Sequence, residues 1–437
     1  MTLESHLLKA LAPWRDAPAW RIALSGGLDS TVLLHVLVSL AQREALPPLS
    51  AIHIHHGLQS AADAWPAHCR ALCARLGVPL QVEYVQVAPG ASVERAARDA
   101  RYAAFEAALA PGELLLVAQH RDDQAETLLF RLLRGAGVQG LAAMPASRPL
   151  GEGHVLRPLL KCSRAELLTY AEQQQLAWIE DPSNADSRFS RNYLRHRVLP
   201  LLQARWPQAP QSMALAAEHL SEAAQLLDEL AQQDLRLAHL SIRFTWLNLP
   251  SLSLPALREL SEPRQRNALR CWLRARTAMP DSGHWAGWED LRDAARDAAP
   301  LWRLAAGELH RADERLWWLA GAWLQTPQLP EQPLQADQWL ALPNNGAVLL
   351  QGRAPLGELQ LTYRQGGEAM EVPGRGRRDL KRLLNERHVP VFLRTRLPLL
   401  LQDGRIVAVA NLSGLDGPAD GRWRLIWRPP IDDQGLS

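Results

Sequence analysis

In the first third of the chain, short apolar runs typical of buried strands alternate with segments that have the apolar spacing of helices. Four short apolar runs predict buried strands, at Ala19–Leu24, Ser50–Ile54, Leu80–Val87 and Glu113–Ala118. Segments with helical spacing follow them, at Leu28–Leu40, Trp65–Leu76, Ser92–Ala110 and Asp122–Arg134. Strands and helices that alternate in units of about 30 residues predict a parallel, doubly wound α/β sheet. Such sheets bind their ligands beyond the carboxyl ends of the strands.

The rest of the chain is less regular. A helix with a capping-box start is expected at Ser163–Gln175, and an arginine-rich helix at Tyr193–Gln203 follows the loop Trp178–Asn192. A long helix over Met213–Leu237 connects to a middle region, Leu240–Leu324, rich in Leu, Trp and Arg; core packing is the expected use of these tryptophans.

A proline- and glutamine-rich linker, Gln325–Gln335, precedes the last part of the chain. Alternating patterns predict strands at Leu340–Leu350, Gly357–Tyr363 and Arg405–Ala410 around a basic helix, Asp379–Glu386. We therefore expect three domains: an α/β domain over 1–212, a helical middle domain with its connecting helix over 213–325, and a small α+β domain over 336–437.

The first strand turns into the first helix of the sheet through Ser25-Gly26-Gly27-Leu28-Asp29-Ser30. Two glycines permit a sharp turn, and the first N–H groups of a helix have no intrahelical partner. These groups and the positive end of the helix dipole favour an anion such as phosphate. An ordinary loop in which Ser25 or Ser30 caps the helix is the alternative. The string is neither a Walker loop nor a G-x-G-x-x-G motif.

Polar side chains also follow two other expected strands. Around the second strand, His53, His55 and His56 favour a structural or nucleotide-contacting histidine over a zinc site. The fourth strand leads into a helix start where Asp122 or Asp123 can act as a cap, with Glu126 one turn further on. These carboxylates suit a metal–triphosphate site or the ammonium group of an amine. A helix start that is merely rich in acids is the alternative.

The composition narrows the class of protein. The chain has 437 residues, 47% of them hydrophobic, and no segment approaches 18 uninterrupted apolar residues, so no membrane span is expected. The first residues read as a short amphipathic helix without a signal-peptide apolar region, which predicts a cytoplasmic protein. The cysteines (Cys69, Cys73, Cys162, Cys271) lack the spacing of a metal or cluster site and are expected to be buried thiols.

Two basic stretches interrupt a chain whose net charge is only +2. Five arginines (Arg188, Arg191, Arg195, Arg197, Arg205) lie in a segment without an acidic residue between Ser187 and Ala217. From Gly374 to Arg396, eight basic residues stand against two acidic ones, a local net charge of +6. Each stretch is either a solvated face or a contact with a polyanion, and two of them together favour the polyanion.

The motifs, taken in their order along the chain, resemble those of known protein families. SGGLDS resembles the SGGxDS pyrophosphate loop of the N-type ATP pyrophosphatase superfamily, whose members split ATP between its α and β phosphates. The order SGGLDS, HHGL, RDDQAET with RLLRGAGVQGL, RPLL, EDPSN and SRNYLRHRVLP is similar to the bacterial tRNA(Ile)-lysidine synthetases. The RQRNALR segment of the middle region and the GRGRRDLKRLLNERHVP segment of the last domain also fit. The resemblance implies an adenine nucleotide alpha hydrolase-like catalytic domain followed by two tRNA-binding domains.

The resemblance also implies roles for individual residues, and ATP and Mg²⁺ as cofactors. Asp29, Asp123 and Glu126 would be catalytic, and Asp29 would hold the Mg²⁺ ion. ATP would be bound by Ser25, Gly26, Gly27, Leu28, Asp29, Ser30 and His55. Lysine would be bound by Asp123, Glu126, Arg98 and Arg101. Transfer RNA would be bound by Arg191, Asn192 and Arg195 near the anticodon loop, and by Arg377, Arg378, Lys381 and Arg382 on its backbone.

The implied reaction adenylates the 2-oxo group of the wobble cytidine in an isoleucine tRNA with anticodon CAU, and lysine then displaces AMP to give lysidine. Three alternatives remain open. A tRNA thiolase of the same superfamily needs reactive or cluster-binding cysteines. An amide-forming enzyme of small metabolites explains neither basic stretch. A non-catalytic RNA-binding protein need not keep Asp29, Asp122, Asp123 and Glu126.

Overall fold

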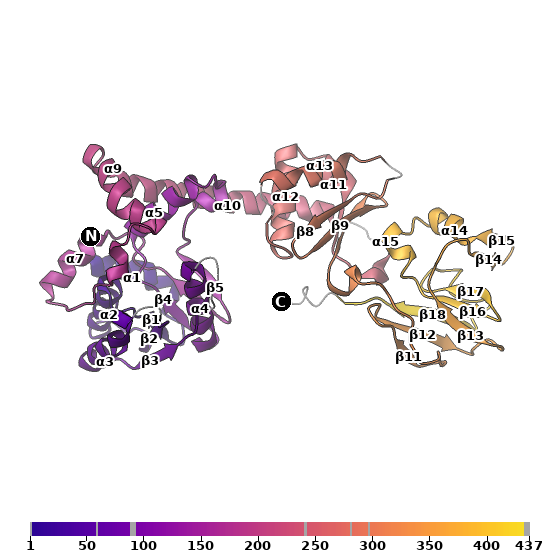
Figure 1. The fold of residues 1–437 in the computed structure, drawn as a ribbon, viewed down its shortest axis with the longest axis horizontal. Coiled ribbons are helices and arrows are strands. Elements are labelled where there is room, and N and C mark those ends of the chain that lie inside the picture. Colours follow the sequence, from indigo (N-terminus) through magenta and orange to yellow (C-terminus); the bar gives the residue numbers. More distant parts are fainter. Residues whose placement is uncertain are drawn as a thin grey trace. The chain divides into compact units, whose positions relative to one another are not determined.

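The structure is a computed structural model that describes residues 2–57, 60–87, 93–239, 243–279, 282–295 and 298–431. The chain forms two compact units, Met1–Leu226 and Leu227–Ser437, and the division falls within the long helix α10 (Ala209–Ala238) (Figure 1). Among the described residues, no helix combines the length and the apolar character that crossing a membrane requires.

Unit 1 is built on a six-stranded sheet with the order β3-β2-β1-β4-β6-β5. All neighbouring strands are parallel except β5 and β6, which form an antiparallel hairpin at one edge. The mostly parallel sheet expected from the sequence is confirmed, and the hairpin is an addition that the apolar pattern did not predict. The strands are β1 (Trp20–Ala23), β2 (Leu49–His55), β3 (Leu80–Tyr84), β4 (Leu114–Leu116), β5 (Ser147–Leu150) and β6 (Gly153–Leu156).

Helices cover both faces of this sheet because successive side chains of a strand point to opposite sides. In β4, Leu114 and Leu116 belong to one core, whereas Leu115 belongs to another. The first core includes α1 (Leu3–Leu11), α2 (Leu28–Ala41), α3 (Trp65–Leu76) and α7 (Arg164–Gln173). The second core includes α4 (Val93–Ala108). The sheet is therefore doubly covered, and its strand ends remain available for a site.

The chain then adds α5 (Arg121–Leu132), α6 (Val138–Leu141) and a broken helix in the arginine-rich segment. The expected helix Tyr193–Gln203 is present, but it is not a regular α-helix throughout. The segment consists of α8 (Ser190–Tyr193), a π-helical turn (Leu194–Val198) and α9 (Leu199–Arg205). Pro200 stands at the start of α9, where its missing N–H group cannot continue the regular pattern of helical hydrogen bonds.

The first part of unit 2 combines helices with a sheet. The expected helices are present, but an antiparallel sheet of order β7-β10-β9-β8, which was not predicted, accompanies them. Trp272, Trp288, Trp302 and Trp318 lie in its core, as expected for tryptophans that pack rather than stack on bases. The elements are β7 (Ser251–Ser253), α11 (Leu254–Arg258), α12 (Glu262–Arg274), α13 (Ala286–Asp293), β8 (Leu301–Leu304), β9 (Gly307–Ala312) and β10 (Arg315–Leu319).

The last part of unit 2 contains two sheets, of order β11-β12-β18 and β13-β16-β17-β14-β15. The single strand expected at Leu340–Leu350 is wrong, because the chain reverses at Gly346 (φ +74°), where a Cβ atom would clash with the carbonyl of Arg428. The elements are β11 (Trp339–Ala341), β12 (Ala347–Gly352), β13 (Leu359–Thr362), β14 (Ala369–Val372), β15 (Gly376–Asp379), α14 (Leu380–Glu386), α15 (Val391–Arg394), β16 (Leu399–Gln402), β17 (Arg405–Val409) and β18 (Trp423–Arg428).

Candidate active site

The SGGLDS loop connects β1 to α2 with its hydroxyl groups turned inward. The Oγ atoms of Ser25 and Ser30 lie 3.0 Å apart, and the backbone N–H of Ser25 donates to Oγ of Ser30 at 3.2 Å. Gly27 stands at the N-cap of α2 and donates its own N–H to Oγ of Ser25 at 3.3 Å, but among the described residues no side chain caps the first turn of that helix. Leu28 is buried, so only its backbone can face a ligand. The amino end of α2 is therefore left for an anion.

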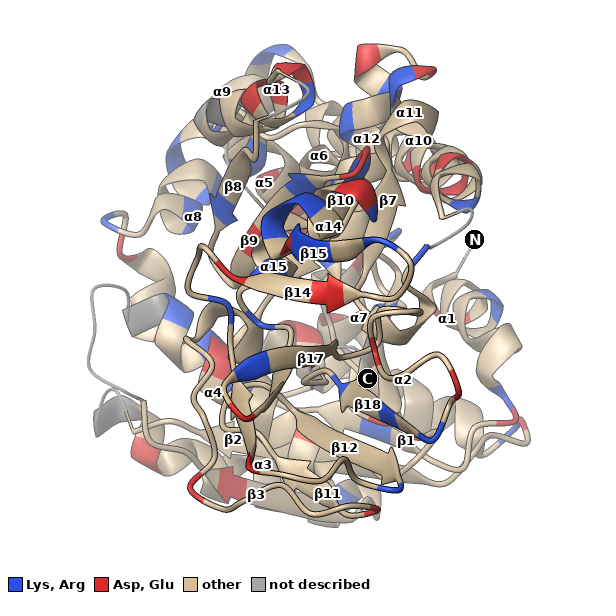
Figure 2. Cartoon of the chain, turned by 90° about the vertical axis from the view of Figure 1, so that its right-hand side faces the viewer, with Lys and Arg blue, Asp and Glu red and all other residues tan. Residues whose placement is uncertain are grey.

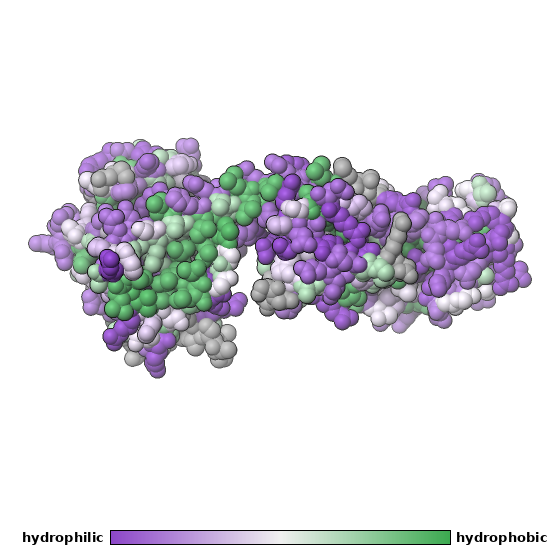
Figure 3. Space-filling model, turned by 90° about the horizontal axis from the view of Figure 1, so that it is seen from above, coloured by the Kyte–Doolittle hydropathy of each residue, from purple (hydrophilic) through white to green (hydrophobic). Residues whose placement is uncertain are grey.

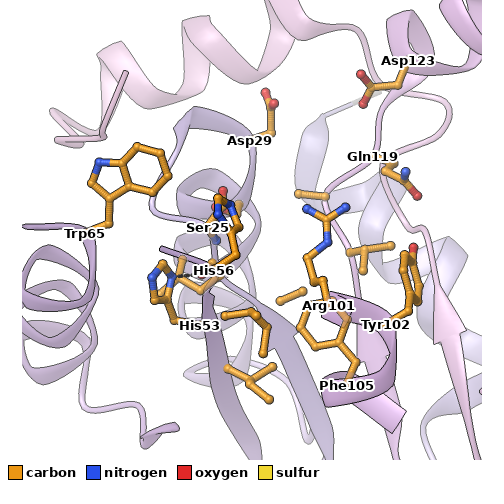
Figure 4. Close-up of a pocket in the computed structure, with 17 residues that line it drawn as sticks. Ser25, Asp29, His53, His56, Trp65, Arg101, Tyr102, Phe105, Gln119 and Asp123 are labelled. Atoms are coloured by element: carbon orange, nitrogen blue, oxygen red, sulfur yellow. Dashed lines mark hydrogen bonds between the residues drawn. The ribbon is translucent and has the colours of Figure 1, made fainter. Parts of the chain in front are cut away.

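A cavity of about 280 Å³ lies at the carboxyl ends of the parallel strands, next to this loop. Figure 4 shows Asp29 and Asp123 at one end of the cavity and Arg101 rising between them from α4. Trp65 and Tyr102 stand on opposite walls. The volume lies near the lower end of the range of about 300–1,000 Å³ for small-molecule sites.

Three buried polar atoms in this cavity form no hydrogen bond within the described part of the chain. They are Oδ1 of Asp29, Nε2 of His53 and Nδ1 of His56. The other nitrogen of His53, Nδ1, lies 2.8 Å from the carbonyl of Leu24. Burial lowers the pKa of both histidines, so they are neutral at neutral pH. Neutral rings and an unpaired carboxylate oxygen offer both donors and acceptors to a polar ligand.

His120 sits between the carboxylates at one end of the cavity. Its ring accepts the backbone N–H of Asp123 at Nδ1, and the carboxylate of Asp123 accepts the backbone N–H of His120 in return. The Nε2 atom lies 3.6 Å from Oδ2 of Asp29 and 3.5 Å from Oδ2 of Asp123. Burial would lower the pKa of His120, but the contacts with Asp29 and Asp123 raise it above its ordinary value.

The guanidinium of Arg195 forms hydrogen bonds with two carboxylates of α5. Its Nε donates to Oε1 of Glu126 at 2.6 Å, and its Nη2 donates to Oε2 of Glu126 at 3.0 Å and to Oδ1 of Asp123 at 2.8 Å. Glu126 is only 2% exposed, and burial raises its pKa although Arg195 opposes the shift. The structure thus brings Asp123 and Glu126 together and adds Arg195, a residue expected at the RNA.

The residues fit a magnesium ion that is shared with phosphate groups. Oδ1 of Asp29 is buried without a hydrogen-bond partner among the described residues, and it stands in the first turn of α2 beside the loop. Within the described ranges, no group of three or more His, Cys, Asp and Glu residues could hold a metal by itself. Mg²⁺ usually needs only one or two carboxylates, because substrate phosphates and water complete its octahedron.

The remaining expected residues of unit 1 lie near the cavity or in its supporting loops. Arg101 lines the cavity, whereas the guanidinium of Arg98 lies over the ring of Tyr102, 4.9 Å from its centroid. His55 is absent from the cavity lining; its Nε2 lies 3.3 Å from Asp63. Asn192 donates from Nδ2 to the carbonyls of Ser183 and Asp186, which fixes the loop before α8.

The basic residues expected on the last domain lie on β15 and α14. Figure 2 shows Lys and Arg gathered on these two elements, and Arg377, Arg378, Lys381 and Arg382 are all exposed. Hydrophilic side chains cover most of the visible face of this domain in Figure 3. We call these four residues the β15–α14 surface. Its charges are accessible to a polyanion, in contrast to Arg396, which is buried.

Sequence reasoning missed most of the cavity walls. Trp65, Tyr102 and Gln119 line the cavity without having been assigned a role in it, and His53 and His56, expected only as structural or nucleotide-contacting histidines, line it as well. His56 directly follows β2 and Gln119 comes three residues after the end of β4, so their place near a strand end was an available signal. Trp65 and Tyr102 lie on α3 and α4, where an aromatic residue is indistinguishable from a core residue in the sequence.

Cys69, Cys73 and Cys162 are buried thiols as expected, whereas Cys271 is only half-buried. Burial raises the pKa of Cys69 to about 12 and that of Cys73 and Cys162 to about 11. Thiols with such values carry almost no thiolate at neutral pH and are poor nucleophiles and metal ligands. The three buried cysteines therefore give no support to the thiolase alternative.

Comparisons with known proteins agree with this arrangement. A PP-loop domain family matches residues 1–202. A curated tRNA(Ile)-lysidine synthase of Pseudomonas fluorescens is 62% identical over 99% of this chain and 98% of its own length, and that of Pseudomonas aeruginosa is 60% identical over 100% and 99%. The chain belongs to the tRNA(Ile)-lysidine synthase family. A more distant relative, from Coxiella burnetii, is 38% identical over 97% of this chain and 96% of its own length.

The family assignment confirms the resemblance and the class of ATP-dependent ligases. Two further families match unit 2, a TilS substrate binding domain at residues 252–317 and a TilS substrate C-terminal domain at residues 359–427. Each matched range lies inside one of the three expected domains, whereas the boundary between the compact units lies inside the second. The domain limits at 212, 325 and 336 stay predictions.

Proposed function

We propose that this chain joins L-lysine to the wobble cytidine of the CAU anticodon of tRNA(Ile), with ATP and Mg²⁺. The product, lysidine, pairs with adenosine instead of guanosine and changes the specificity of the tRNA from methionine to isoleucine. In this proposal, residues 1–212 catalyse the reaction in the cytoplasm, and residues 213–325 and 336–437 bind the tRNA. The relationship over the full chain length supports it.

The reaction has two balanced steps. The 2-oxo oxygen of the cytidine attacks the α-phosphorus of ATP, the bond to the bridging oxygen breaks, and pyrophosphate leaves. The ε-amine of lysine then attacks C2 of the cytidine, the C2–O bond breaks, AMP leaves with the oxygen, and the amine loses a proton. Adenylation converts a poor oxygen leaving group into AMP, which is why ATP is consumed.

The observation that carries the proposal is one cavity lined by both parts of the machinery. Ser25, Ser30 and Asp29 come from the anion-binding loop, and Asp123 comes from the start of α5. The amino end of α2 binds the pyrophosphate as its charge develops. A bound Mg²⁺ would neutralise charge on the phosphates, with Asp29 as its protein ligand.

Side chains in the cavity and next to it would bind different groups of the lysine molecule. Asp123 and Glu126 bind its ammonium group, because two carboxylates provide the negative charge that a cation needs away from bulk water. Arg101, between Asp29 and Asp123 in Figure 4, binds the carboxylate of lysine or a phosphate, and Arg98 adds a second positive charge nearby. His53 and His56 offer neutral donors and acceptors to the nucleotide.

Incubation of the purified chain with ATP, Mg²⁺, radiolabelled lysine and an unmodified tRNA(Ile) transcript tests this function. We expect label to enter the RNA only when lysine, ATP and the CAU anticodon are all present. A transcript with another anticodon is the matched control. No incorporation by protein that still binds ATP and tRNA would contradict lysine as the nucleophile.

A further inference from the structure

The two carboxylates assigned to the lysine ammonium group are already occupied by Arg195. Its guanidinium forms three hydrogen bonds of 2.6 to 3.0 Å with Asp123 and Glu126. This forked contact uses both oxygens of Glu126 and one oxygen of Asp123. Each of these oxygens could accept a second hydrogen bond, but the side chain of Glu126 is only 2% exposed while Arg195 is in place. Lysine can therefore reach Glu126 only where the Arg195 side chain gives way, so the two compete for one subsite.

We propose that Arg195 is an exchangeable counterion of the lysine subsite. It pairs with Asp123 and Glu126 while lysine is absent, yields them to the ammonium group of lysine, and then pairs with a phosphate of the bound RNA. The inference rests on the proposed function and adds to it a link between RNA binding and lysine binding.

Charge balance requires an exchange rather than a vacancy. The side chain of Glu126 is 2% exposed, and a buried carboxylate without a counterion is strongly unfavourable. Replacing the single positive charge of Arg195 by the single positive charge of lysine leaves the net charge around Glu126 unchanged. His120 cannot take this part, because it already contacts Asp29 and Asp123 through Nε2. Glu126 therefore has one positively charged partner both before and after the exchange.

The position of Arg195 allows its guanidinium to withdraw from Asp123 and Glu126. Its side chain is 32% exposed, whereas that of Glu126 is almost fully buried, so the open side of the ion pair belongs to the arginine. The residue lies in the π-helical turn Leu194–Val198 between α8 and α9. Such turns carry an extra residue and often mark functional sites. Shifting the helical register by one residue turns a side chain by about 100° around the axis, which would withdraw the guanidinium.

The same segment attracts the competing anion. Arg197 and Arg205 are exposed, and residues 187–217 contain no acidic side chain. Arg191, one helical turn before Arg195, has its Nη2 atom 3.5 Å from Oγ1 of Thr127 and so lies against the same helix, α5. An RNA backbone on this segment brings phosphates within reach of Arg195, and arginine binds phosphate through the same fork that binds carboxylates.

The exchange has a thermodynamic consequence. If RNA draws Arg195 away from Asp123 and Glu126, RNA must strengthen lysine binding, and lysine must strengthen RNA binding by the same factor. Typical coupling between two sites is about 5–150-fold, and we expect a value in that range. The enzyme would then bind its amino acid firmly only when the RNA that receives it is present.

Lysine binding measured by equilibrium dialysis tests the exchange in the full chain. The reaction is blocked with an ATP analogue that has a methylene group between the α and β phosphates, with and without saturating unmodified tRNA(Ile) transcript. For the natural protein we expect tRNA to strengthen lysine binding by about 5–150-fold. In Arg195→Gln, lysine should bind tightly without tRNA, and tRNA should add less than about twofold. Arg197→Gln, on the same segment, should keep the coupling.

A second variant covers the case in which Arg195→Gln does not fold. Arg195→Lys keeps a positive charge but loses the fork, so it should strengthen lysine binding without tRNA by a smaller factor. Weaker lysine binding in these variants, with and without tRNA, or an unchanged coupling factor, overturns the exchange. If the natural protein forms lysidine but shows no coupling, the exchange alone fails. If it binds no lysine at all, the proposed function fails as well.

Discussion

The ring of His120 reaches Asp29 across the edge of the sheet, with 3.6 Å between its Nε2 and Oδ2 of the carboxylate. His120 follows β4, whereas Asp29 lies in the first turn of α2, after β1. β1 and β4 are parallel neighbours, so their carboxyl ends bring these two residues together. The contact orients one oxygen of Asp29 and leaves Oδ1 without a partner among the described residues. This geometry leaves Oδ1 available to a ligand.

Asp29→Asn should separate catalysis from RNA binding. The substitution keeps the size of the side chain but removes the charge that would hold Mg²⁺, so we expect lysine incorporation to fall by at least about 10²-fold. The affinity for tRNA should stay nearly unchanged, because Asp29 is not one of the residues expected to bind tRNA. Incorporation rates and filter binding of tRNA measure the two effects. Asp16→Asn, on an exposed turn, is the control. An equal loss of activity and tRNA affinity would contradict this division.

The two glycines of the loop should respond differently to alanine. Gly26 has φ +86°, and a Cβ atom there would lie 2.9 Å from Cδ1 of Ile179 and 3.2 Å from Sγ of Cys69. Gly27 has φ −74°, and its nearest neighbour would be Oγ of Ser25 at 3.4 Å. Gly26→Ala should therefore lower the free energy of unfolding of unit 1 by about 1–2 kcal/mol.

Gly27→Ala is the matched control for this effect and should change the unfolding free energy by less than about 0.5 kcal/mol. Urea unfolding, followed in each variant under the same conditions, measures the difference. Equal destabilisation by the two substitutions would show that the conformation of Gly26 is not the constraint.

The sequence was most informative where structure is decided locally. The strands β1, β2 and β4 are apolar runs because both faces of the sheet are covered. The strand β15 could not be found in this way: its residues, Gly376–Asp379, are all exposed, and pairing with β14 defines it. Short antiparallel strands with polar side chains leave no periodic apolar signal to detect.

The candidate site could also be predicted only where local sequence patterns determine it. The SGGLDS loop and the Asp123–Glu126 spacing are local patterns, so their chemistry could be read from neighbouring residues. Arg195 and Arg197 are alike in sequence, but one is drawn inward by buried Glu126 and the other is exposed. That difference depends on how α5 packs against the segment after α8, which no local pattern contains.

Charge reversal on the β15–α14 surface should weaken tRNA binding and make the remaining binding less sensitive to salt. Arg377 and Arg378 are exposed, so Arg377→Glu with Arg378→Glu should leave the fold intact. For each RNA phosphate that the variant no longer neutralises, the slope of log K against log salt concentration should become shallower by about 0.7–0.9. Arg353→Glu with Arg405→Glu, two exposed arginines of the same unit, is the control. A salt slope equal to that of the natural protein would show that this surface does not bind RNA.

The buried guanidinium of Arg396 should be essential for the stability of unit 2. It donates to the carbonyls of Ala322, Trp323, Gln325 and Asn344 and to Oδ1 of Asn345, and burial lowers its pKa. These acceptors lie in different segments, which Arg396 therefore holds together. Arg396→Leu leaves several of them buried and unpaired at about 1–3 kcal/mol each.

We expect Arg396→Leu to lower the free energy of unfolding of this unit by at least about 3 kcal/mol. Tryptophan fluorescence during urea unfolding can detect this, because the ring of Trp323 lies beside the Arg396 guanidinium, at 5.3 Å. Arg405→Leu, at an exposed position, should change stability by no more than about 0.5 kcal/mol. Similar effects of the two substitutions would mean that the carbonyl groups around Arg396 find other donors, and that the arginine is not what joins these segments.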